Sequence, residues 1–301
     1  MKCRHCARPA VLNMRQHKLA LCEIHYPEWF VARTQRTIQK YAMFGYEERV
    51  LVAVSGGKDS LSLWDVLLRL GYQADGLYID LGITDYSALS RQKVEQFAAQ
   101  RSGVSLTVVD LKAEYGETLP ETARRVRHGR ERPCSVCGTI KRHVMNRVAR
   151  DGGYTALATG HNLDDEAAVL FGNVLHWQTG YMARQAPVLP AEYEGFVRKV
   201  KPFCRLYERE TAAYALITGI DYIYDECPYA VGASSIYYKG ILDRMEEEAP
   251  GTKLQFYLGF LRAREAGFFR QEVERVELHP CTNCGQPTSA PGLCAFCRLW
   301  G

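Results

Sequence analysis

Short apolar runs alternate with stretches of helical periodicity through the middle of the chain. Residues 50–54 form a continuous, β-branched apolar run, as is typical of a strand buried on both faces of a parallel sheet. After residue 60 the apolar positions follow helical spacing and end near Gly71, which suits the position just past a helix. The same patterns predict further strands at 76–80, 106–110 and 154–159 and further helices at 88–102 and 166–177. We therefore expect an α/β fold with a doubly wound, mostly parallel sheet and with ligands at the carboxyl ends of its strands.

The pattern also divides the chain into parts. Both ends are short segments with paired cysteines, and residues 233–266 show a helical pattern that leads to the second of them. Before that pattern, residues 221–225 resemble a strand. We predict an N-terminal zinc module at 1–28, a catalytic α/β domain at 29–232, a helical connector at 233–272 and a zinc ribbon at 273–301.

A glycine-containing loop follows the first predicted strand and opens the first predicted helix. It reads Ser55-Gly56-Gly57-Lys58-Asp59-Ser60. Strand, loop and helix in this order direct backbone N–H groups and the positive end of a helix toward an anion. The glycines let the backbone approach bound oxygens, Lys58 adds a mobile positive charge, and Asp59 can hold Mg²⁺. A Walker A loop has four residues between its first glycine and Gly-Lys, so this phosphate site is of another type.

A second loop, residues 160–165, follows the strand predicted at 154–159 and is therefore expected at the same edge of the sheet. Its last two residues, Asp164 and Asp165, are adjacent carboxylates that can hold Mg²⁺ against phosphate oxygens. Taken alone, Asp164 is equally well explained as the N-terminal cap of the next helix. Beside the glycine loop, the metal-binding interpretation is favoured. Residues 78–80 end another strand at this edge, where we expect them to flank the adenine or the ribose of a nucleotide.

The paired cysteines at the two ends have the spacing of zinc ligands. The sets are Cys3, Cys6, Cys22 and His25 near one end and Cys281, Cys284, Cys294 and Cys297 near the other. Each set of four fits one tetrahedral zinc ion. Because closed four-ligand sites leave no position for a substrate, we expect two structural zinc ions that allow these small modules to fold.

Three further cysteines, Cys134, Cys137 and Cys227, lie outside the zinc sets. The first two follow Pro133, a good start for a helix, so both thiols share one helix face with Lys141 one turn further on. If the three thiols converge, they can ligate three irons of a cubane cluster and leave the fourth iron open. A third zinc with an outside ligand and a dithiol that carries persulfide sulfur are the alternatives.

Charge is unevenly distributed along the chain. The whole chain carries a formal net charge of +4, whereas residues 124–150 contain nine Lys and Arg against one acid, Glu131, which gives +8. Such a stripe indicates a polyanionic partner, although for charge alone a solvated helix face is an equally good explanation. No apolar run approaches the roughly 20 residues that span a membrane, and no signal peptide is expected. Because the cysteine pairs favour metal binding over disulfides, we expect a cytoplasmic protein.

The order of these motifs resembles the TtcA/TtuA family of tRNA thiolases, which belong to the PP-loop ATP pyrophosphatases. Members of that superfamily cleave ATP between the α- and β-phosphates and adenylate an oxygen of the substrate. Zinc modules at both ends resemble the TtuA branch, the tRNA 2-thiouridine synthetases. The motifs that carry the resemblance are Ser-Gly-Gly-Lys-Asp-Ser, Pro-Cys-Ser-Val-Cys-Gly, Gly-His-Asn-Leu-Asp-Asp and Cys227-Pro228.

The resemblance implies ATP-dependent 2-thiolation of tRNA. The C2 oxygen of a uridine or ribothymidine, position 54 of the TΨC loop, would be adenylated and then replaced by sulfur delivered at a [4Fe-4S] cluster. Members of the family act as homodimers and receive sulfur from a ubiquitin-like, thiocarboxylated carrier protein. The implied cluster ligands are Cys134, Cys137 and Cys227, and the implied catalytic residues are Asp59, Lys141 and Asp165. The expected ATP-binding set is Ala53, Ser55, Gly56, Gly57, Lys58, Asp59, Ser60, Tyr78, Ile79, Gly160 and Asp165.

Other functions are compatible with parts of this pattern. Within the family, the target can instead be the wobble uridine or a cytidine. A PP-loop ligase that hands an adenylate to an amine, as in amidating synthetases or lysidine synthesis, has no need of three convergent thiols. A zinc-ribbon RNA-binding module with a degenerate nucleotide fold has no reason to keep Lys58, Asp59 and Asp165 together.

Overall fold

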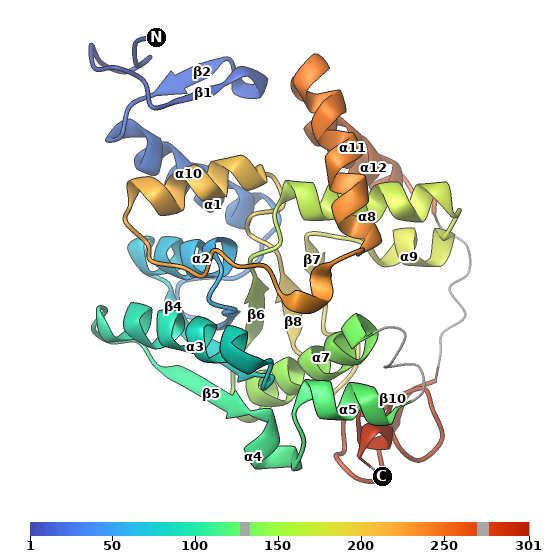
Figure 1. Cartoon of the computed structure of the whole chain (residues 1–301). Coiled ribbons are helices and arrows are strands. Elements are labelled where there is room, and N and C mark those ends of the chain that lie inside the picture. The colour runs from blue at the N-terminus through green and yellow to red at the C-terminus, as the bar shows by residue number, and fades with distance from the viewer. Residues whose placement is uncertain (127–132, 270–276, 301) are drawn as a thin grey trace.

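A six-stranded sheet forms the centre of the molecule in the computed structural model, which describes residues 1–126, 133–269 and 277–300 (Figure 1). The strand order is β5-β4-β3-β6-β8-β7, and all neighbours are parallel except the edge pair β7 and β8. The strands are β3 (Arg49–Ala53), β4 (Gln73–Asp80), β5 (Leu106–Asp110), β6 (Ala156–Thr159), β7 (Val188–Leu189) and β8 (Arg198–Val200). The predicted α/β fold with a mostly parallel sheet is confirmed.

The strand order reverses between β3 and β6. From β3 the chain moves outward through β4 to β5 and then returns to the other side of β3 to form β6. The carboxyl ends of β3 and β6 therefore diverge into a crevice, and this position binds ligands in doubly wound sheets. Both motif-bearing loops, 54–57 and 160–162, leave their strands at this crevice.

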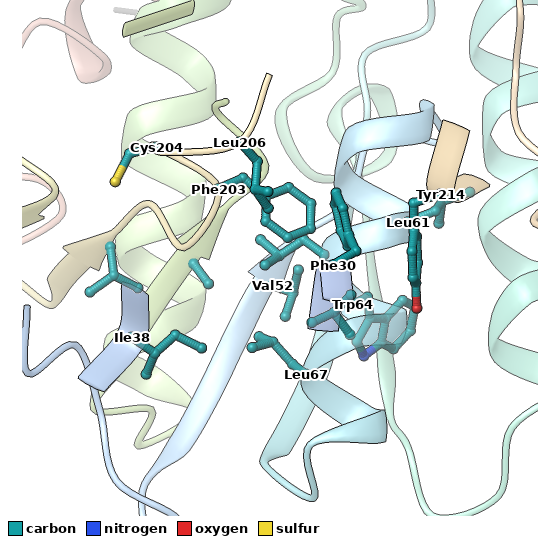
Figure 2. Close-up of a cluster of buried hydrophobic side chains, with 14 of the residues drawn as sticks. Phe30, Ile38, Val52, Leu61, Trp64, Leu67, Phe203, Cys204, Leu206 and Tyr214 are labelled. Atoms are coloured by element: carbon teal, nitrogen blue, oxygen red, sulfur yellow. The ribbon is translucent and has the colours of Figure 1, made fainter. Parts of the chain in front are cut away.

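One face of the sheet is covered by helices from both halves of the chain. Alternate residues of β3, such as Val52, point into a core with Trp64 and Phe30, all fully buried (Figure 2). The ring of Phe30 lies 4.4 Å from that of Tyr214, and Trp64 Nε1 donates to the carbonyl of Ala74 at 2.9 Å. The helices that contribute to this core are α1 (His25–Lys40), α2 (Lys58–Arg69), α3 (Thr84–Ala99), α8 (Leu163–Leu175), α9 (Thr179–Arg184), α10 (Glu208–Ile217) and α12 (Thr252–Glu265).

The opposite face packs against a second core. Leu51 of β3 points to this side, between the outward positions of its neighbours, and meets the buried face of α7 (Pro133–Asp151). The short helices α4 (Leu111–Tyr115) and α5 (Leu119–Arg125) lie at its edge. The C-terminal module also packs here, and the four elements that form it are β9 (His279–Pro280), β10 (Pro287–Thr288), their connecting turn and η3 (Cys297–Leu299).

The N-terminal module packs on the first core. It is a hairpin of β1 (Leu12–Met14) and β2 (Leu19–Leu21) joined by η1 (Arg15–His17). Helix α11 (Ser234–Glu248) lies against α8 and is reached through η2 (Pro228–Ala230). Figure 1 shows the two terminal modules at opposite ends of the molecule.

Two details of the sequence-based prediction are wrong. Residues 221–225 form no strand, because the edge of the sheet is completed by β8 and β7, which are too short to show a periodic pattern. The helical stretch from 233 to 266 is broken into α11 and α12 at Pro250 and Gly251, since Gly251 has a φ of +100°. No helix in the described ranges is both long and apolar enough to cross a membrane.

Candidate functional site

The glycine loop joins β3 to α2 with its backbone held open. Gly56 has a φ of +79°, and a Cβ placed on it would lie 2.7 Å from the carbonyl oxygen of Ser90. The Ser60 hydroxyl accepts from the backbone N–H of Ser55 at 3.0 Å and donates to the Gly57 carbonyl at 3.1 Å. The loop thus curls over the N-terminus of α2, where free N–H groups favour an anion.

The second loop touches the first. A Cβ on Gly160 would lie 2.9 Å from both the carbonyl carbon of Asp59 and the backbone nitrogen of Ser60. Only glycine therefore allows this approach of the two loops. Helix α8 is capped by Asn162, which accepts from the Asp165 N–H, while the Asn162 N–H donates to Asp165 Oδ2 at 3.0 Å. The interpretation of Asp164 as the cap is wrong, because its carboxylate instead accepts from the backbone of Glu208 and pairs with Lys253.

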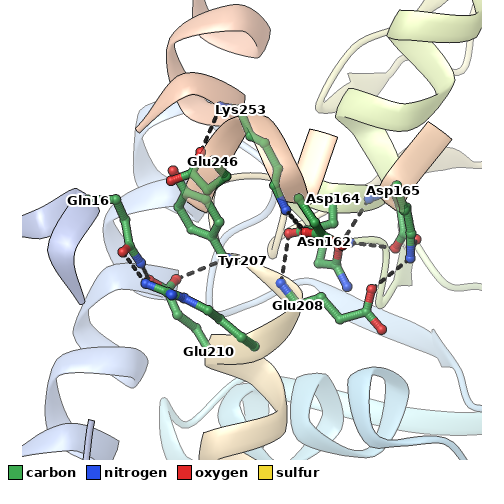
Figure 3. A network of polar contacts seen from close by, with 12 residues as sticks. Gln16, Asn162, Asp164, Asp165, Tyr207, Glu208, Glu210, Glu246 and Lys253 are labelled. Carbon is green, nitrogen blue, oxygen red and sulfur yellow. Dashed lines mark hydrogen bonds and ion pairs between the residues drawn. The ribbon is translucent and has the colours of Figure 1, made fainter. Parts of the chain in front are cut away.

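A closed ring of side chains joins the two loops. Lys58 Nζ lies 3.0 Å from Asp59 Oδ2 and 2.8 Å from Glu208 Oε1. Lys239 Nζ, from α11, lies 2.8 Å from the other oxygen of Glu208 and 2.6 Å from Asp165 Oδ1. The Asn162 side-chain N–H closes the ring by donating to Asp59 Oδ1 at 3.2 Å. Figure 3 shows Asn162, Asp165 and Glu208 in this network, with Asp164 and Lys253 beside them. Its ionic members are Asp59, Asp165 and Glu208 against Lys58 and Lys239.

The ring has an excess of carboxylates, and its groups strongly affect one another's ionisation. Burial raises the pKa of Asp59, and the charges of Glu208 and Asp165 add to this effect while Lys58 opposes it. Burial also opposes ionisation of Glu208, yet the charges of Lys239 and Lys58 lower its pKa to about 2. Three carboxylates face two ammonium groups, so the site suits a divalent cation whose ligands are oxygens.

The expected nucleotide-binding residues line a cavity of about 80 Å³ beside the glycine loop. Ala53, Ser55, Tyr78 and Ile79 contribute to its wall together with Lys141 from α7. The Tyr78 hydroxyl is already engaged, because it donates to the Ser87 carbonyl at 2.9 Å and lies 2.6 Å from the Ser90 hydroxyl. The structure therefore brings an implied catalytic lysine to the pocket predicted for adenine or ribose.

Next to this cavity lie the three cysteines outside the terminal modules. Helix α7 begins at Pro133, as predicted, and Cys134 donates its S–H to the Tyr229 carbonyl at 3.2 Å, beside Cys227. Burial raises the pKa of Cys137, with the Lys141 charge opposing and the Cys227 and Cys134 thiolates adding to it. The three thiols are therefore neighbours.

The spacing of these thiols differs from that of a zinc site. With Zn–S bonds of about 2.3 Å, tetrahedral ligand atoms lie about 3.8 Å apart. Within the described ranges, the only groups whose ligand atoms all lie within 4.8 Å of one another are the two terminal sets. Cys134, Cys137 and Cys227 are more widely spaced, which suits a cluster that places each sulfur on a different iron.

Both terminal sets are arranged as zinc ligands require. The Sγ atoms of Cys6 and Cys22 are 3.7 Å apart, and those of Cys284 and Cys294 are 3.8 Å apart. His25 Nδ1 lies 3.2 Å from Cys22 Sγ. The other members, Cys3, Cys281 and Cys297, lie within the same groups. Backbone N–H groups lower the pKa of Cys281 to about 6 against the effect of burial, which favours the thiolate that binds metal.

The basic stripe is neutralised in part. Arg125, Arg147 and Arg150 pair with Glu117, Glu114 and Asp151 respectively. The segment 127–132, which holds Arg127, Arg130, Glu131 and Arg132, lies outside the described residues.

Sequence reasoning missed Glu208, Lys239 and Asn162. Asn162 stands three residues before Asp165, which is the spacing of a helix cap and could have been recognised. Glu208 begins a helix after Tyr207, a weaker signal of the same kind. Lys239 lies within a helical stretch among other polar residues, and nothing in its neighbourhood sets it apart.

The fold and this site define a PP-loop nucleotide-binding protein. The PP-loop domain model matches residues 30–230. The chain is 52% identical to the tRNA-5-methyluridine(54) 2-sulfurtransferase of Thermus thermophilus, over all of this chain and 91% of that protein. It is 43% identical to the enzyme of the same name from Pyrococcus horikoshii, over all of this chain and 94% of that protein. The chain therefore belongs to the PP-loop family of tRNA 2-sulfurtransferases.

A solved structure shares this fold over nearly the whole chain. The U34-tRNA thiolase NcsA from Methanococcus maripaludis, determined with its [4Fe-4S] cluster, aligns with a TM-score of 0.82 at 24% identity. The alignment covers 99% of this chain and 95% of that one. The likeness thus includes the two terminal modules as well as the central sheet.

Proposed function

We propose that this protein is an ATP-dependent tRNA 2-thiolase that acts on 5-methyluridine 54. The observation that carries the proposal is the full-length identity of 52% to a tRNA-5-methyluridine(54) 2-sulfurtransferase. The convergence of the glycine loop, the paired carboxylates and the three thiols at one edge of the sheet supports the same activity.

In the first step, the C2 oxygen of the base attacks the α-phosphate of ATP and pyrophosphate leaves. Backbone N–H groups of residues 55–60 and Lys58 stabilise the charge that develops on the phosphates, and Asp59 and Asp165 are placed to hold Mg²⁺. Lys141, which lines the cavity, is placed to stabilise the adenylated base. An amide-like oxygen is a poor leaving group until it is phosphorylated, so adenylation makes the second step possible.

In the second step, a sulfur nucleophile attacks C2, and AMP carries away the original oxygen. Cys134, Cys137 and Cys227 would hold a [4Fe-4S] cluster, which supplies an open iron where sulfide can bind. Lys141 lies between the nucleotide cavity and Cys137, so this chain can orient the adenylated base toward the sulfur.

The proposal extends to partners and to the remaining metals. The terminal modules 1–28 and 273–301 would each hold one structural zinc, on either side of the catalytic part 29–232 and the connector 233–272. The tRNA would bind along the basic stripe with an affinity that falls as salt rises. Sulfur would come from a ubiquitin-like thiocarboxylated carrier, and the enzyme would act as a homodimer in the cytoplasm.

Mass spectrometry of tRNA nucleosides tests the activity. Unmodified tRNA with 5-methyluridine 54 is incubated anaerobically with reconstituted protein, ATP and sulfide, and we expect 5-methyl-2-thiouridine together with AMP and pyrophosphate. Asp59→Ala should abolish both products because it removes a metal ligand, whereas Asp151→Ala, at an exposed carboxylate on the far end of α7, should not. Thiolation at another nucleotide would contradict the assigned target, and ADP with phosphate as the main products would contradict adenylation.

A further inference from the structure

The carboxylate of Glu208 is held between two lysines at the head of the glycine loop. One oxygen lies 2.8 Å from Lys58 Nζ and the other 2.8 Å from Lys239 Nζ. The two lysines come from α2 and α11, and Glu208 opens α10, so three elements far apart in the chain meet at this one anion. An anion bridging two ammonium groups beside free helix N–H groups occupies the type of position that a phosphate takes.

The surroundings allow this carboxylate to move. The Glu208 side chain is 36% exposed, and beside it lies a solvent-filled pocket of about 460 Å³ that Lys58 and Tyr207 also line. Its backbone N–H is fixed by Asp164 Oδ2 at 2.8 Å, so the side chain can swing without displacing the helix. By contrast, the Lys239 side chain is less exposed, at 24%, and both of its partners are carboxylates.

We propose that Lys239 is a second cation for the β- and γ-phosphates of ATP and that Glu208 is the anion that holds both lysines until ATP displaces it. The inference deepens the proposed function, since it assigns the triphosphate contacts within the same ATP site. On binding, Lys58 and Lys239 exchange a carboxylate for phosphate oxygens, and charge remains balanced throughout.

The exchange has a second effect on the site. Lys239 also pairs with Asp165, and Lys58 with Asp59. When the lysines turn to the phosphates, both carboxylates become available to a magnesium ion that arrives with the nucleotide. Because α11 follows the segment that carries Cys227, movement of Lys239 also reports nucleotide binding to the cysteine loop.

A purely structural role for the ring makes the opposite prediction for Glu208. If the ring only holds the loops together, removing the charge of either residue should weaken nucleotide binding. If Glu208 competes with phosphate, Glu208→Gln should instead strengthen it, because the substitution removes the competing anion and makes the site less negative. The signs of the two effects therefore distinguish the two roles.

Calorimetric titration of the full-length protein with Mg²⁺ and α,β-methylene-ATP, which resists cleavage, measures both. We expect Lys239→Met to weaken binding about tenfold or more, the size of one charge-assisted contact, and Glu208→Gln to tighten it several-fold. AMP, which lacks the β- and γ-phosphates, should bind Lys239→Met and wild type equally. Lys112→Met, at an exposed lysine paired with Glu121, is the matched control and should bind as wild type.

Two outcomes would overturn the assignment. One is wild-type affinity of Lys239→Met for the triphosphate analogue, and the other is weaker binding by Glu208→Gln. If Lys239→Met does not fold, Lys239→Arg retains the charge and should keep most of the affinity, so its loss would also count against the proposal. These titrations contain no tRNA, so a failure to thiolate tRNA would leave them interpretable and would bear only on the proposed function.

Discussion

At the scale of single residues, the approach of the two loops depends on side chains that are absent. Gly160 faces the backbone of Asp59 and Ser60, and Gly56 faces the backbone of Ser90. Backbone atoms cannot rotate away as a flexible side chain does. A methyl group at either position must therefore move one loop relative to the other.

We predict that Gly160→Ala lowers kcat/KM for ATP at least about tenfold, because a displaced loop loses phosphate contacts worth about 1.4 kcal/mol or more. Steady-state kinetics of pyrophosphate release would measure the effect. Gly180→Ala is the control, since the space around Gly180 in α9 is open. It should leave the kinetics unchanged and add about 0.5–1 kcal/mol of helix stability. Equal kinetics for the two variants would contradict the role of Gly160.

At this scale the sequence indicated the groups that have a local pattern. The glycine loop, Asp59 and the zinc ligands lie at fixed spacings, so they could be read directly. Glu208 and Lys239 could not be found in this way, because Glu208 reaches Lys58 across 150 residues and gains its meaning only from that contact. A charged residue near the start of a helix is otherwise ordinary.

At the scale of elements, helix α7 connects the site to the C-terminal module. Its first turn holds Cys134 and Cys137, and further along its buried face the ring of His143 stacks on Phe296 with centroids 3.7 Å apart. Gln286 of the module donates to the His143 carbonyl at 3.2 Å. Loss of this docking would therefore act on the helix that carries two of the three thiols.

The docking should weaken in acid. Burial, together with the charges of Arg147 and Arg150, lowers the pKa of His143 to about 4, below the ordinary value of about 6.5. The unfolded chain therefore binds the proton first, so this stabilisation is complete above about pH 6.5 and is lost as the pH falls toward about 4. Its upper limit is about 3 kcal/mol.

The free energy of unfolding of wild type and His143→Gln, measured in urea across this range, checks the expectation. Glutamine does not titrate, so the difference between the two proteins should fall by about 1–3 kcal/mol from neutral pH to about pH 4.5. Comparison with the variant cancels acid effects on the cysteines, which the two proteins share. A constant difference would show that His143 is not the titrating group.

Elements of ordinary length were predictable and very short ones were not. Strand β5 occupies the predicted residues 106–110, because five alternating or apolar positions suffice to show a pattern. Strands β7 and β8 have two and three residues, and tertiary contacts alone determine them. The segment 221–225 has the composition of a strand but lies beside the glycine loop, where the Ile223 N–H donates to the Gly56 carbonyl at 2.9 Å.

At the scale of the whole molecule, the sheet separates two cores, and each terminal module packs on a different one. Cys3 and Cys22 belong to the first core, and Cys281 and Cys294 to the second. The three remaining thiols lie apart from both modules. Removal of one metal should thus leave the other two sites intact.

Metal analysis of anaerobically reconstituted protein tests this separation. We expect about two zinc and about four irons per chain, given four zinc ligands in each module and a cubane cluster. Alanine at Cys134, Cys137 or Cys227 should remove the iron and the thiolation activity together but leave the zinc. Cys204→Ala, at a thiol buried in the first core, is the control and should keep the iron. Full thiolation by iron-free wild type would instead favour a persulfide carried by the dithiol.

The position of the N-terminal module has a consequence for synthesis on the ribosome. Its hairpin is made first, yet Gln16 and His17 dock on Glu210, which is translated 194 residues after Gln16. At bacterial rates of elongation this interval lasts roughly 10–40 s. Through that time the nascent hairpin has no core to pack on, and captured zinc is the only interaction that can keep it folded. The supply of zinc during translation, before any catalytic residue exists, therefore decides whether this module is ready when α10 emerges.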